Sequence, residues 1–238
     1  ERGGFFKNDK MKIVYFFLLV IMMFSCSEKN SNKSEFVDYF YPYDTIPKIY
    51  VYRDVVGGLN EQFHRVYGVE DEAGKHIIVE LYSSDFRLTE ALNYNHPSLE
   101  LQDHMVTNGK KQKSKADLIK SKAFPLGDHD TSEFLSRFPS HIDSTKIIQL
   151  KKRVLKNKTE TILYLNKKTP AISFYDTINL AVVNSKEEQL NNLNGAQLVY
   201  FAKDIGKVEW HSMDKKAHYK LEKVMNQKDW INIIKQLK

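Results

Sequence analysis

Hydrophobic and polar residues alternate along much of the chain from residue 48 onward, which is the pattern of half-buried β-strands. Polar or glycine-containing segments at 70–75, 156–158 and 204–206 interrupt the alternation and read as hairpin turns. The pattern therefore predicts a meander of antiparallel hairpins. The predicted strands are 49–52, 63–69, 76–82, 88–94, 99–106, 147–155, 161–165, 198–202, 208–213 and 218–225.

Three segments carry a capping box, in which the residue before a helix and the third helical residue satisfy each other's free amides. The boxes pair Asp130 with Glu133, Ser185 with Glu188, and Asn226 with Asp229. The third box precedes Trp230, Ile233, Ile234 and Leu237, which fall at i, i+3, i+4 and i+7 and form an apolar stripe. We therefore predict three short helices, of which the C-terminal one is amphipathic and packs on the sheet.

Strands in runs, with a few helices set apart from them, indicate the α+β class with a mostly antiparallel sheet. Composition agrees with a packed, strand-rich core, because the chain holds 13 Tyr and 14 Phe but only 10 Gly. The apolar share of 42% and the charged share of 28% exclude a polytopic membrane protein, a collagen-like fibre and a mostly disordered chain.

The segment from Met11 to Cys26 has the order of features found in an export signal. Lys12 supplies positive charge, and 13–24 is a twelve-residue apolar run. As a helix this run would measure roughly 18 Å, too short for the about 30 Å of bilayer hydrocarbon. Ser25 and Cys26, the single cysteine, follow it, and 27–35 then contains no apolar side chain.

This order resembles the signal of bacterial lipoproteins, with Met23-Phe24-Ser25-Cys26 as the lipobox, although Leu is usual at Met23 and a small residue at Phe24. The resemblance implies cleavage before Cys26 and acylation of its thiol, with palmitate among the chains. More than one acyl chain would hold the protein stably on a membrane. We therefore expect a protein of the cell envelope, lipid-anchored to a bacterial membrane, with the outer membrane favoured and the domain in the periplasm or at the cell surface.

The same resemblance divides the chain. Residues 1–25 are expected to be removed, and they comprise an extension before Met11 and the signal peptide. Residues 26–35 form the lipidated cysteine and a flexible tether, and 36–238 form a single β-rich domain.

Charge is distributed unevenly along the chain, which allows an alternative division of the domain into two lobes. Residues 27–105 hold 14 acidic and 7 basic residues, a net charge of −7, and 106–238 hold 14 acidic and 25 basic residues, a net charge of +11. The domain could therefore consist of two lobes, an acidic one over 36–126 and a basic one over 145–238, which attract one another.

A second resemblance concerns the segment Tyr200–Trp210, which contains Phe-Ala-Lys-Asp-Ile-Gly-Lys-Val. It is similar to a hairpin of the form F-A-K-x-x-G-x-V found in many β-rich envelope lipoproteins of unknown function. Some of those proteins fold as curved sheets wrapped around a helix. The resemblance implies a curved sheet and carries no activity.

Catalytic motifs are absent from the sequence. It contains no G-x-S-x-G, P-loop, H-E-x-x-H or G-x-G-x-x-G pattern, and acylation would remove its one thiol. Its eight histidines are scattered, and the one flanked by carboxylates, in Asp128-His129-Asp130, lies where Asp130 is already expected to cap a helix. We therefore expect no enzymatic activity, no cofactor and no metal.

Two segments are candidates for contact with a membrane or a partner. The first is aromatic and contains Phe36, Tyr39, Phe40, Tyr41 and Tyr43, which could sit at a membrane interface near the tether or instead form a first strand or latch packed on the sheet. The second is the basic run Lys151, Lys152 and Arg153, which could face anionic lipid. Nucleic acid is not an expected partner of an exported protein.

Together these features predict a non-catalytic binding or assembly module with an envelope protein as its partner. The alternative is a protein that binds lipid or another hydrophobic ligand in a cavity of the curved sheet, and an enzyme is the least favoured class. A ligand-binding protein should contain a lined cavity, whereas an assembly module should have a filled sheet and an exposed aromatic or basic patch.

Overall fold

The computed structural model describes residues 33–58, 60–108, 110–142 and 144–236. The predicted signal peptide, Cys26, the first part of the predicted tether and Leu237 lie outside the described residues. From Lys33 onward the chain forms one compact unit. Within the described residues, no helix is long and apolar enough to cross a membrane.

Strands make up most of the described chain. They are β1 (Lys48–Asp54), β2 (Glu61–Asp71), β3 (Gly74–Tyr82), β4 (Leu88–His96), β5 (Leu101–Thr107), β6 (Lys113–Lys115), β7 (Asp117–Lys122), β8 (Thr131–Pro139), β9 (Lys146–Tyr164), β10 (Lys167–Val183), β11 (Gln189–Ala202), β12 (Gly206–Ser212) and β13 (His218–Asn226). The helical elements are a three-residue 3-10 helix (Val37–Tyr39) and the C-terminal helix α2 (Gln227–Gln236).

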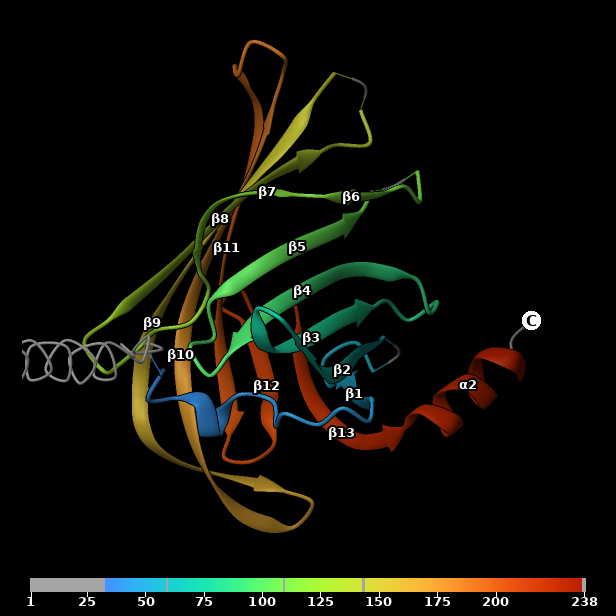
Figure 1. Ribbon diagram of the computed structural model, residues 1–238, viewed down its shortest axis with the longest axis vertical. Coiled ribbons are helices and arrows are strands. Elements are labelled where there is room, and N and C mark those ends of the chain that lie inside the picture. Colours follow the sequence, from blue (N-terminus) through green and yellow to red (C-terminus); the bar gives the residue numbers. More distant parts are fainter. Residues whose placement is uncertain (1–32, 59, 109, 143, 237–238) are drawn as a thin grey trace, which may run out of the picture. The chain divides into compact units, whose positions relative to one another are not determined.

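All thirteen strands belong to one antiparallel sheet, in the order β6-β5-β4-β3-β2-β1-β13-β12-β11-β10-β9-β8-β7. The sheet curls until its edge strands approach each other, so that β7 lies near β5 and β6 lies near β8 (Figure 1). The first and last strands, β1 and β13, pair in the middle of the sheet. The acidic and the basic halves of the sequence are therefore joined by a continuous hydrogen-bonded ladder.

The predicted α+β class is wrong, because two of the three predicted helices are strands or turns. Asp130 does accept a hydrogen bond from a backbone amide, but the amide is that of Leu126 at 2.8 Å, so the carboxylate closes a turn before β8. In the second segment the side chain of Asn184 accepts hydrogen bonds from the amides of Lys186 and Glu188, and β11 follows. Asn, Asp and Ser side chains accept hydrogen bonds from backbone amides in turns as well as at the first turn of a helix. The capping-box pattern therefore does not distinguish these two structures.

The turn predicted at 156–158 is also wrong, because β9 continues through it. The ladder between β9 and β10 is irregular near Asn157, so the polar residues mark a bulge instead of a reversal. The chain reverses at Leu165 and Asn166, whose φ angles are 45° and 64°. Two successive residues with positive φ are the geometry of a tight hairpin turn.

The predicted C-terminal helix is confirmed, and Asn226 caps its first turn. The backbone amide of Asp229 donates to Asn226 Oδ1, and the side-chain amide nitrogen Nδ2 of Asn226 donates to Asp229 Oδ2, both at 2.9 Å. Trp230 is buried on the outer face of the sheet, with its ring centroid 4.8 Å from that of Phe63 on β2. Strand β1 is therefore covered on both faces, since Ile49 and Val51 lie under the helix and the residues between them face inward.

The segment before β1 fills one part of the space inside the curled sheet. Phe36 and Phe40 are buried there, packed edge to face against Phe174 and Phe124, respectively. Gly206 makes this packing possible, because its φ is +105° and a Cβ at that position would lie 2.5 Å from the ring of Tyr41. This explains the glycine of the Phe-Ala-Lys-Asp-Ile-Gly hairpin.

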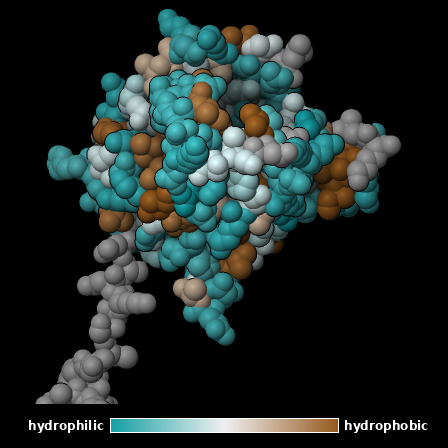
Figure 2. All heavy atoms as spheres, turned by 90° about the horizontal axis from the view of Figure 1, so that it is seen from above, coloured by the Kyte–Doolittle hydropathy of each residue, from teal (hydrophilic) through white to brown (hydrophobic). Residues whose placement is uncertain are grey.

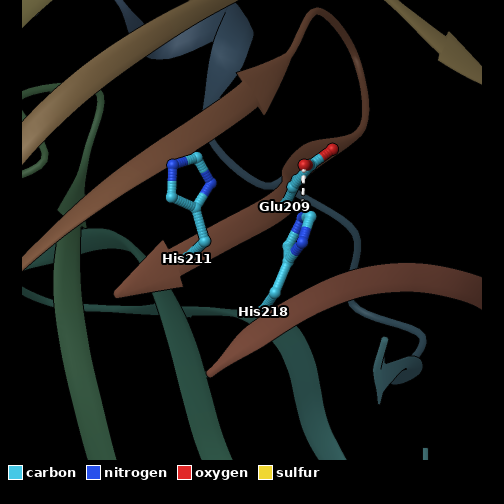
Figure 3. Close-up of side chains that lie close together, drawn as sticks. All are labelled: Glu209, His211 and His218. Atoms are coloured by element: carbon cyan, nitrogen blue, oxygen red, sulfur yellow. Dashed lines mark hydrogen bonds and ion pairs between the residues drawn. The ribbon is translucent and has the colours of Figure 1, made fainter. Parts of the chain in front are cut away.

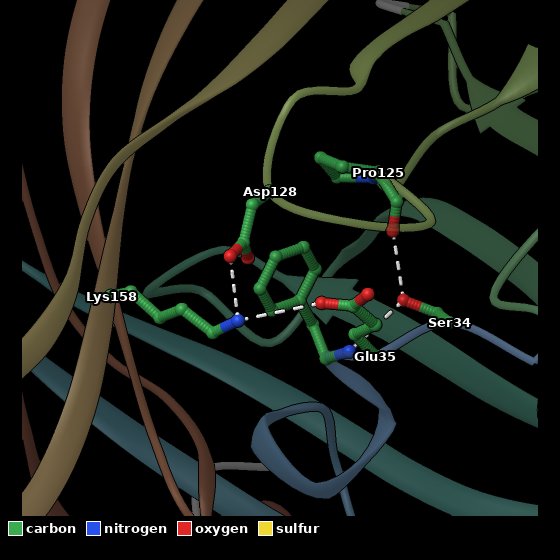
Figure 4. Close-up of polar contacts among 6 residues, drawn as sticks. Ser34, Glu35, Pro125, Asp128 and Lys158 are labelled. Atoms are coloured by element: carbon green, nitrogen blue, oxygen red, sulfur yellow. Dashed lines mark hydrogen bonds and ion pairs between the residues drawn. The ribbon is translucent and has the colours of Figure 1, made fainter.

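The docked segment begins earlier than the predicted domain boundary at residue 36. Ser34 is fully buried, and its hydroxyl donates to the carbonyl of Pro125 at 2.8 Å (Figure 4). Glu35 lies beside Lys158, whose ammonium also contacts Asp128 at 2.7 Å. Residues 34 and 35 are therefore held by the sheet and do not belong to a free tether.

Candidate functional site

A cavity of about 260 Å³ lies inside the curled sheet, next to the docked aromatic segment. Its wall is assembled from strands that are far apart in the sequence, including β2, β4, β9, β11 and β12. Apolar side chains such as Leu92, Phe134 and Trp210 form part of this wall. The remainder is polar and charged, which is unusual for the interior of a sheet.

Strand alternation explains how charged side chains come to face the cavity. Successive residues of a strand point to opposite faces, so Lys151 and Arg153 of β9 point inward while Lys152 between them points outward. Accordingly Lys151 and Arg153 line the cavity, whereas Lys152 lies on the outside, 3.5 Å from Glu133.

Asp176 on β10 is the centre of the charged part. It pairs directly with Arg153 in the ladder between β9 and β10, and its two oxygens accept from Nε and one terminal nitrogen of that guanidinium at 2.7 and 2.9 Å. Lys151 Nζ lies 3.0 Å from the same carboxylate, and Gln197 donates to it at 3.2 Å. A fully buried carboxylate thus holds two cations and an amide in fixed positions.

The electrostatics of this pair follow from its burial. Burial alone would raise the pKa of Asp176, but Arg153 and Lys151 outweigh it and hold that pKa well below its usual range. Burial likewise opposes the charge of Arg153, and Asp176 outweighs it, so the pKa of the guanidinium is raised. Both groups are therefore charged in the folded protein at neutral pH.

Arg153 also connects the charged part to the aromatic part. Its guanidinium carbon lies 4.7, 5.1 and 5.3 Å from the ring centroids of Phe124, Phe201 and Phe174, respectively. Such contacts with ring faces are favourable for a desolvated cation. The guanidinium is therefore saturated by its own neighbours and acts as part of the framework.

Lys207 on β12 differs from Arg153 because no carboxylate lies within ion-pair distance of it among the described residues. Its ammonium lies 3.8 Å from the ring centroid of Trp210, and part of its surface faces the cavity. Burial lowers the pKa of Lys207 to about 7, and the charges of Lys151 and Arg153 add to this effect. Lys207 is thus a cation whose charge has no full compensation in the protein itself.

His64 on β2 forms a hydrogen-bonded group with two tyrosines. Tyr52 donates to the backbone carbonyl of Lys207 at 2.8 Å, and its oxygen lies 3.0 Å from the Tyr41 hydroxyl, which in turn lies 2.8 Å from His64 Nδ1. Burial lowers the pKa of His64, with Lys207 and Lys151 adding to the shift. The ring is therefore neutral and adds no charge to the wall.

A second carboxylate, Glu90 on β4, completes the charged lining. Its Oε1 lies 2.8 Å from Nε2 of the fully buried His104, whose Nδ1 lies 3.1 Å from the Ser136 hydroxyl. Burial would raise the pKa of Glu90, but His104 outweighs it and the pKa is lowered. Glu90 thus has its own partner, whereas in the described part of the chain Lys207 has aromatic rings beside it but no carboxylate within ion-pair distance.

The residues predicted to contact a membrane or partner lie in different places. Phe36, Phe40 and Tyr41 are buried in the interior, and Tyr39 and Tyr43 are half-buried. The arrangement is that of the latch, the alternative considered for this segment. Of the basic run, only Lys152 is on the outer surface.

Asp176, Lys207 and His64 carry no distinctive motif in the sequence. A signal for Asp176 was present, because Phe174, Asp176 and Ile178 share one face of an alternating run and place an acid among inward apolar positions. The signal for Lys207 was weaker, since a lysine just after a hairpin turn is ordinarily exposed.

Among the described residues, one group of histidines and carboxylates has ligand atoms close enough to share a metal ion. It consists of Glu209, His211 and His218. Glu209 and His211 flank Trp210 on β12, and Trp210 lines the cavity, so the group lies on the other face of the sheet.

No family model matches the sequence, and no curated protein matches it. A proposed lipoprotein from Parabacteroides distasonis aligns with a TM-score of 0.46 and 11% identity, over 79% of this chain and 98% of its own. A proposed exported protein with a YmcC-like fold from Bacteroides fragilis aligns with a TM-score of 0.42 and 13% identity, over 79% of this chain and 99% of its own. Likenesses at these scores carry no argument about this chain.

Proposed function

We propose that the chain is a non-catalytic module of the cell envelope, anchored through acyl chains on Cys26, that binds a small anionic ligand inside its sheet. The anchor rests on the signal-like segment that ends at Cys26. The proposed ligand is supported by one observation: among the described residues no carboxylate lies within ion-pair distance of the Lys207 ammonium, which faces a cavity beside Lys151. An anion bound there would provide the negative counter-charge for the Lys207 ammonium.

The lining also selects the kind of anion. A cavity of about 260 Å³ is below the usual range for drug-sized ligands. Aromatic and aliphatic side chains line it beside the lysines. A compact carboxylate with an apolar or aromatic body fits both features, whereas a lipid chain would leave the charged wall unpaired.

Binding can be followed through Trp210, which lies in the cavity wall next to Lys207. In a Trp230→Phe background, Trp210 is the only tryptophan left, because the chain has two. We expect its fluorescence to respond saturably to at least one of acetate, benzoate, octanoate and inorganic phosphate. No response to any of them at millimolar concentration would contradict the proposal.

Strand β9 provides a matched pair of variants for this experiment. Lys151→Met removes a cation from the cavity, and Lys152→Met removes the neighbouring cation from the opposite face of the same strand. We expect the first change to weaken binding by about tenfold or more, the size of one charge-assisted hydrogen bond, and the second to leave it unchanged. Equal loss in both would indicate only general attraction of anions to a basic protein.

A second candidate function is assembly with an envelope protein, and exposed leucines support it. Leu163 and Leu165 lie at one end of the long β9–β10–β11 region, and Leu190 and Leu193 lie near the other; their exposed fractions are 71%, 65%, 58% and 66%. On the face shown in Figure 2, by contrast, hydrophobic residues lie in small patches among hydrophilic ones. Cross-linking in intact cells tests this candidate, since Leu163→Asp together with Leu165→Asp should abolish a specific cross-linked product.

A further inference from the structure

The outer face of the β12–β13 hairpin gathers two imidazoles and a carboxylate. Glu209 and His211 are two positions apart on β12 and therefore point to the same face, and His218 is paired directly opposite His211 in the ladder. Figure 3 shows the three side chains on the same side of the hairpin. The grouping is produced by strand pairing, which explains why the spacing in the sequence did not reveal it.

The distances among these side chains are close to those of a metal site. His218 Nε2 lies 2.6 Å from Glu209 Oε1, the two imidazole ring centroids are 5.3 Å apart, and one ligand atom from each residue lies within 4.8 Å of the others. Zinc binds imidazole nitrogen and carboxylate oxygen at about 2.0–2.2 Å, so two ligands of one tetrahedral ion are separated by about 3.4 Å. The upper limit of 4.8 Å on their separation exceeds this value by about 1.4 Å, so the ligand atoms are already near the spacing of a metal site.

The backbone beneath the group is held firmly. Ser212 and Ala217 close the hairpin, with the Ser212 amide donating to the Ala217 carbonyl at 2.9 Å and the Ala217 amide donating to Ser212 Oγ at 3.0 Å. All three candidate ligands are half-buried, so they are partly ordered by their neighbours yet reachable from solvent. A site that is already assembled avoids part of the entropy cost of gathering its ligands.

We propose that Glu209, His211 and His218 bind one divalent transition-metal ion of the zinc class on the outer face of the hairpin. Two imidazoles and a carboxylate suit Zn²⁺ and its neighbours and disfavour Ca²⁺ and Mg²⁺, which prefer oxygen ligands. Three protein ligands leave a fourth position for water or for a side chain of another molecule. The proposal is independent of the interior cavity and of any ligand bound there.

Lys220 allows metal binding to be distinguished from a purely structural role of the three side chains, because it contacts one of the proposed ligands. It is paired opposite Glu209, its ammonium lies 3.6 Å from Glu209 Oε1, and its side chain is about half exposed, at 51%. The lysine therefore competes with a metal for the same carboxylate. Replacing it with Met should strengthen metal binding, whereas replacing a ligand should weaken it.

The test is isothermal titration of the chelator-treated full chain, in mild detergent, with Zn²⁺. All proteins carry Cys26→Ser, because a free thiol is itself a zinc ligand. We expect one equivalent to bind, His218→Gln and His211→Gln each to weaken binding by about tenfold or more, and Lys220→Met to tighten it. His141→Gln, at an exposed histidine elsewhere, should change nothing.

Two measurements keep the result interpretable. Melting curves without metal show whether a variant is folded, and Co²⁺ in place of Zn²⁺ reports the ligand geometry through its visible absorption. Zinc binding that survives both His→Gln changes in a folded protein would overturn the proposal. Loss of binding in His129→Gln alone would also overturn it, because the ion would then lie at the Asp128–Asp130 turn.

Discussion

The interior of the sheet has two regions with different chemistry, one built from aromatic rings and one containing charged side chains. In the aromatic region, Phe36 packs edge to face against Phe174, and Phe40 packs in the same way against Phe124, within a cluster of buried hydrophobic residues. In the charged region, Asp176 compensates Arg153 and Lys151, but Lys207 faces a cavity without a carboxylate partner. Packing of apolar side chains accounts for the aromatic region. In the charged region, burial of the Lys207 ammonium costs free energy that packing does not offset.

Arg153 shows how the two regions depend on each other. Its guanidinium is bonded to Asp176 on the charged side and faces three phenylalanine rings on the aromatic side. The aromatic segment thus fills one part of the interior. Its contacts with Arg153 also help to fix the position of Asp176, whose carboxylate in turn holds Lys151. The aromatic region therefore provides stability, and the charged region is the one to which the proposed function assigns ligand binding.

The largest effect should come from Asp176→Asn, which keeps the shape of the side chain and removes its charge. Arg153 would then be buried and Lys151 half-buried without this anion, and removing one partner of a buried pair typically costs about 3–5 kcal/mol of the free energy of unfolding. Chemical denaturation measures this loss. Glu133→Gln removes a carboxylate of β8 that lies beside Lys152 on the other face of the sheet, and should have no comparable effect.

A smaller effect of opposite sign is expected for Lys207→Met. The pKa of Lys207 is about 7 in the folded protein and 10.5 ordinarily, so between these pH values the unfolded chain binds more protons and stability rises with pH. Below about pH 7 the penalty is constant. The lowered pKa corresponds to about 4 kcal/mol at pH 7, and loss of the ammonium contact with Trp210 offsets about 1 kcal/mol of this, so removing the charge should raise the free energy of unfolding by about 3 kcal/mol and flatten this rise.

Denaturation of the two proteins at several pH values between 7 and 10 makes this comparison. A pH dependence that is identical in Lys207→Met and in the parent protein would show that another group is responsible. It would also remove the main reason for regarding the charged region as strained.

The smallest effect concerns the start of the aromatic region, where Ser34 and Glu35 have different environments (Figure 4). Ser34→Ala should cost about 1–2 kcal/mol, because the buried carbonyl of Pro125 loses its donor. Glu35→Gln should change little, since Glu35 and Lys158 are both more than half exposed. Equal effects of the two changes on the melting temperature would contradict the assignment of Ser34 as the anchor of this segment.

The sequence predicted the parts of the fold that depend on local patterns. The β2–β3 hairpin, the β11–β12 hairpin and the capped C-terminal helix are examples, because alternation, a turn and a capping box lie within one short segment. The segment 131–139 was misjudged because its inward positions include Ser132 and Ser136, so the alternation of β8 is hidden by polar residues.

The candidate site could not be predicted in the same way. Arg153 and Asp176 are 23 positions apart, and only the register of β9 on β10 makes them partners. A run of three basic residues therefore looked like a surface, although two of its members face inward. The same limit applies to His211 and His218, which face each other only because β12 pairs with β13.

According to the proposed function, Lys207 in its charged form holds an anion in the cavity. The measurement that addresses this is the affinity of the tightest-binding carboxylate of the panel at about pH 6 and about pH 8.5, for the parent protein and for Lys207→Met, because a carboxylate keeps its charge over this range whereas phosphate does not. Because the pKa of Lys207 is about 7, we predict that affinity for the parent protein falls by about 30-fold over this range, while Lys207→Met binds weakly at both pH values. Equal affinity at the two pH values in the parent protein, or undiminished binding by Lys207→Met, would contradict it.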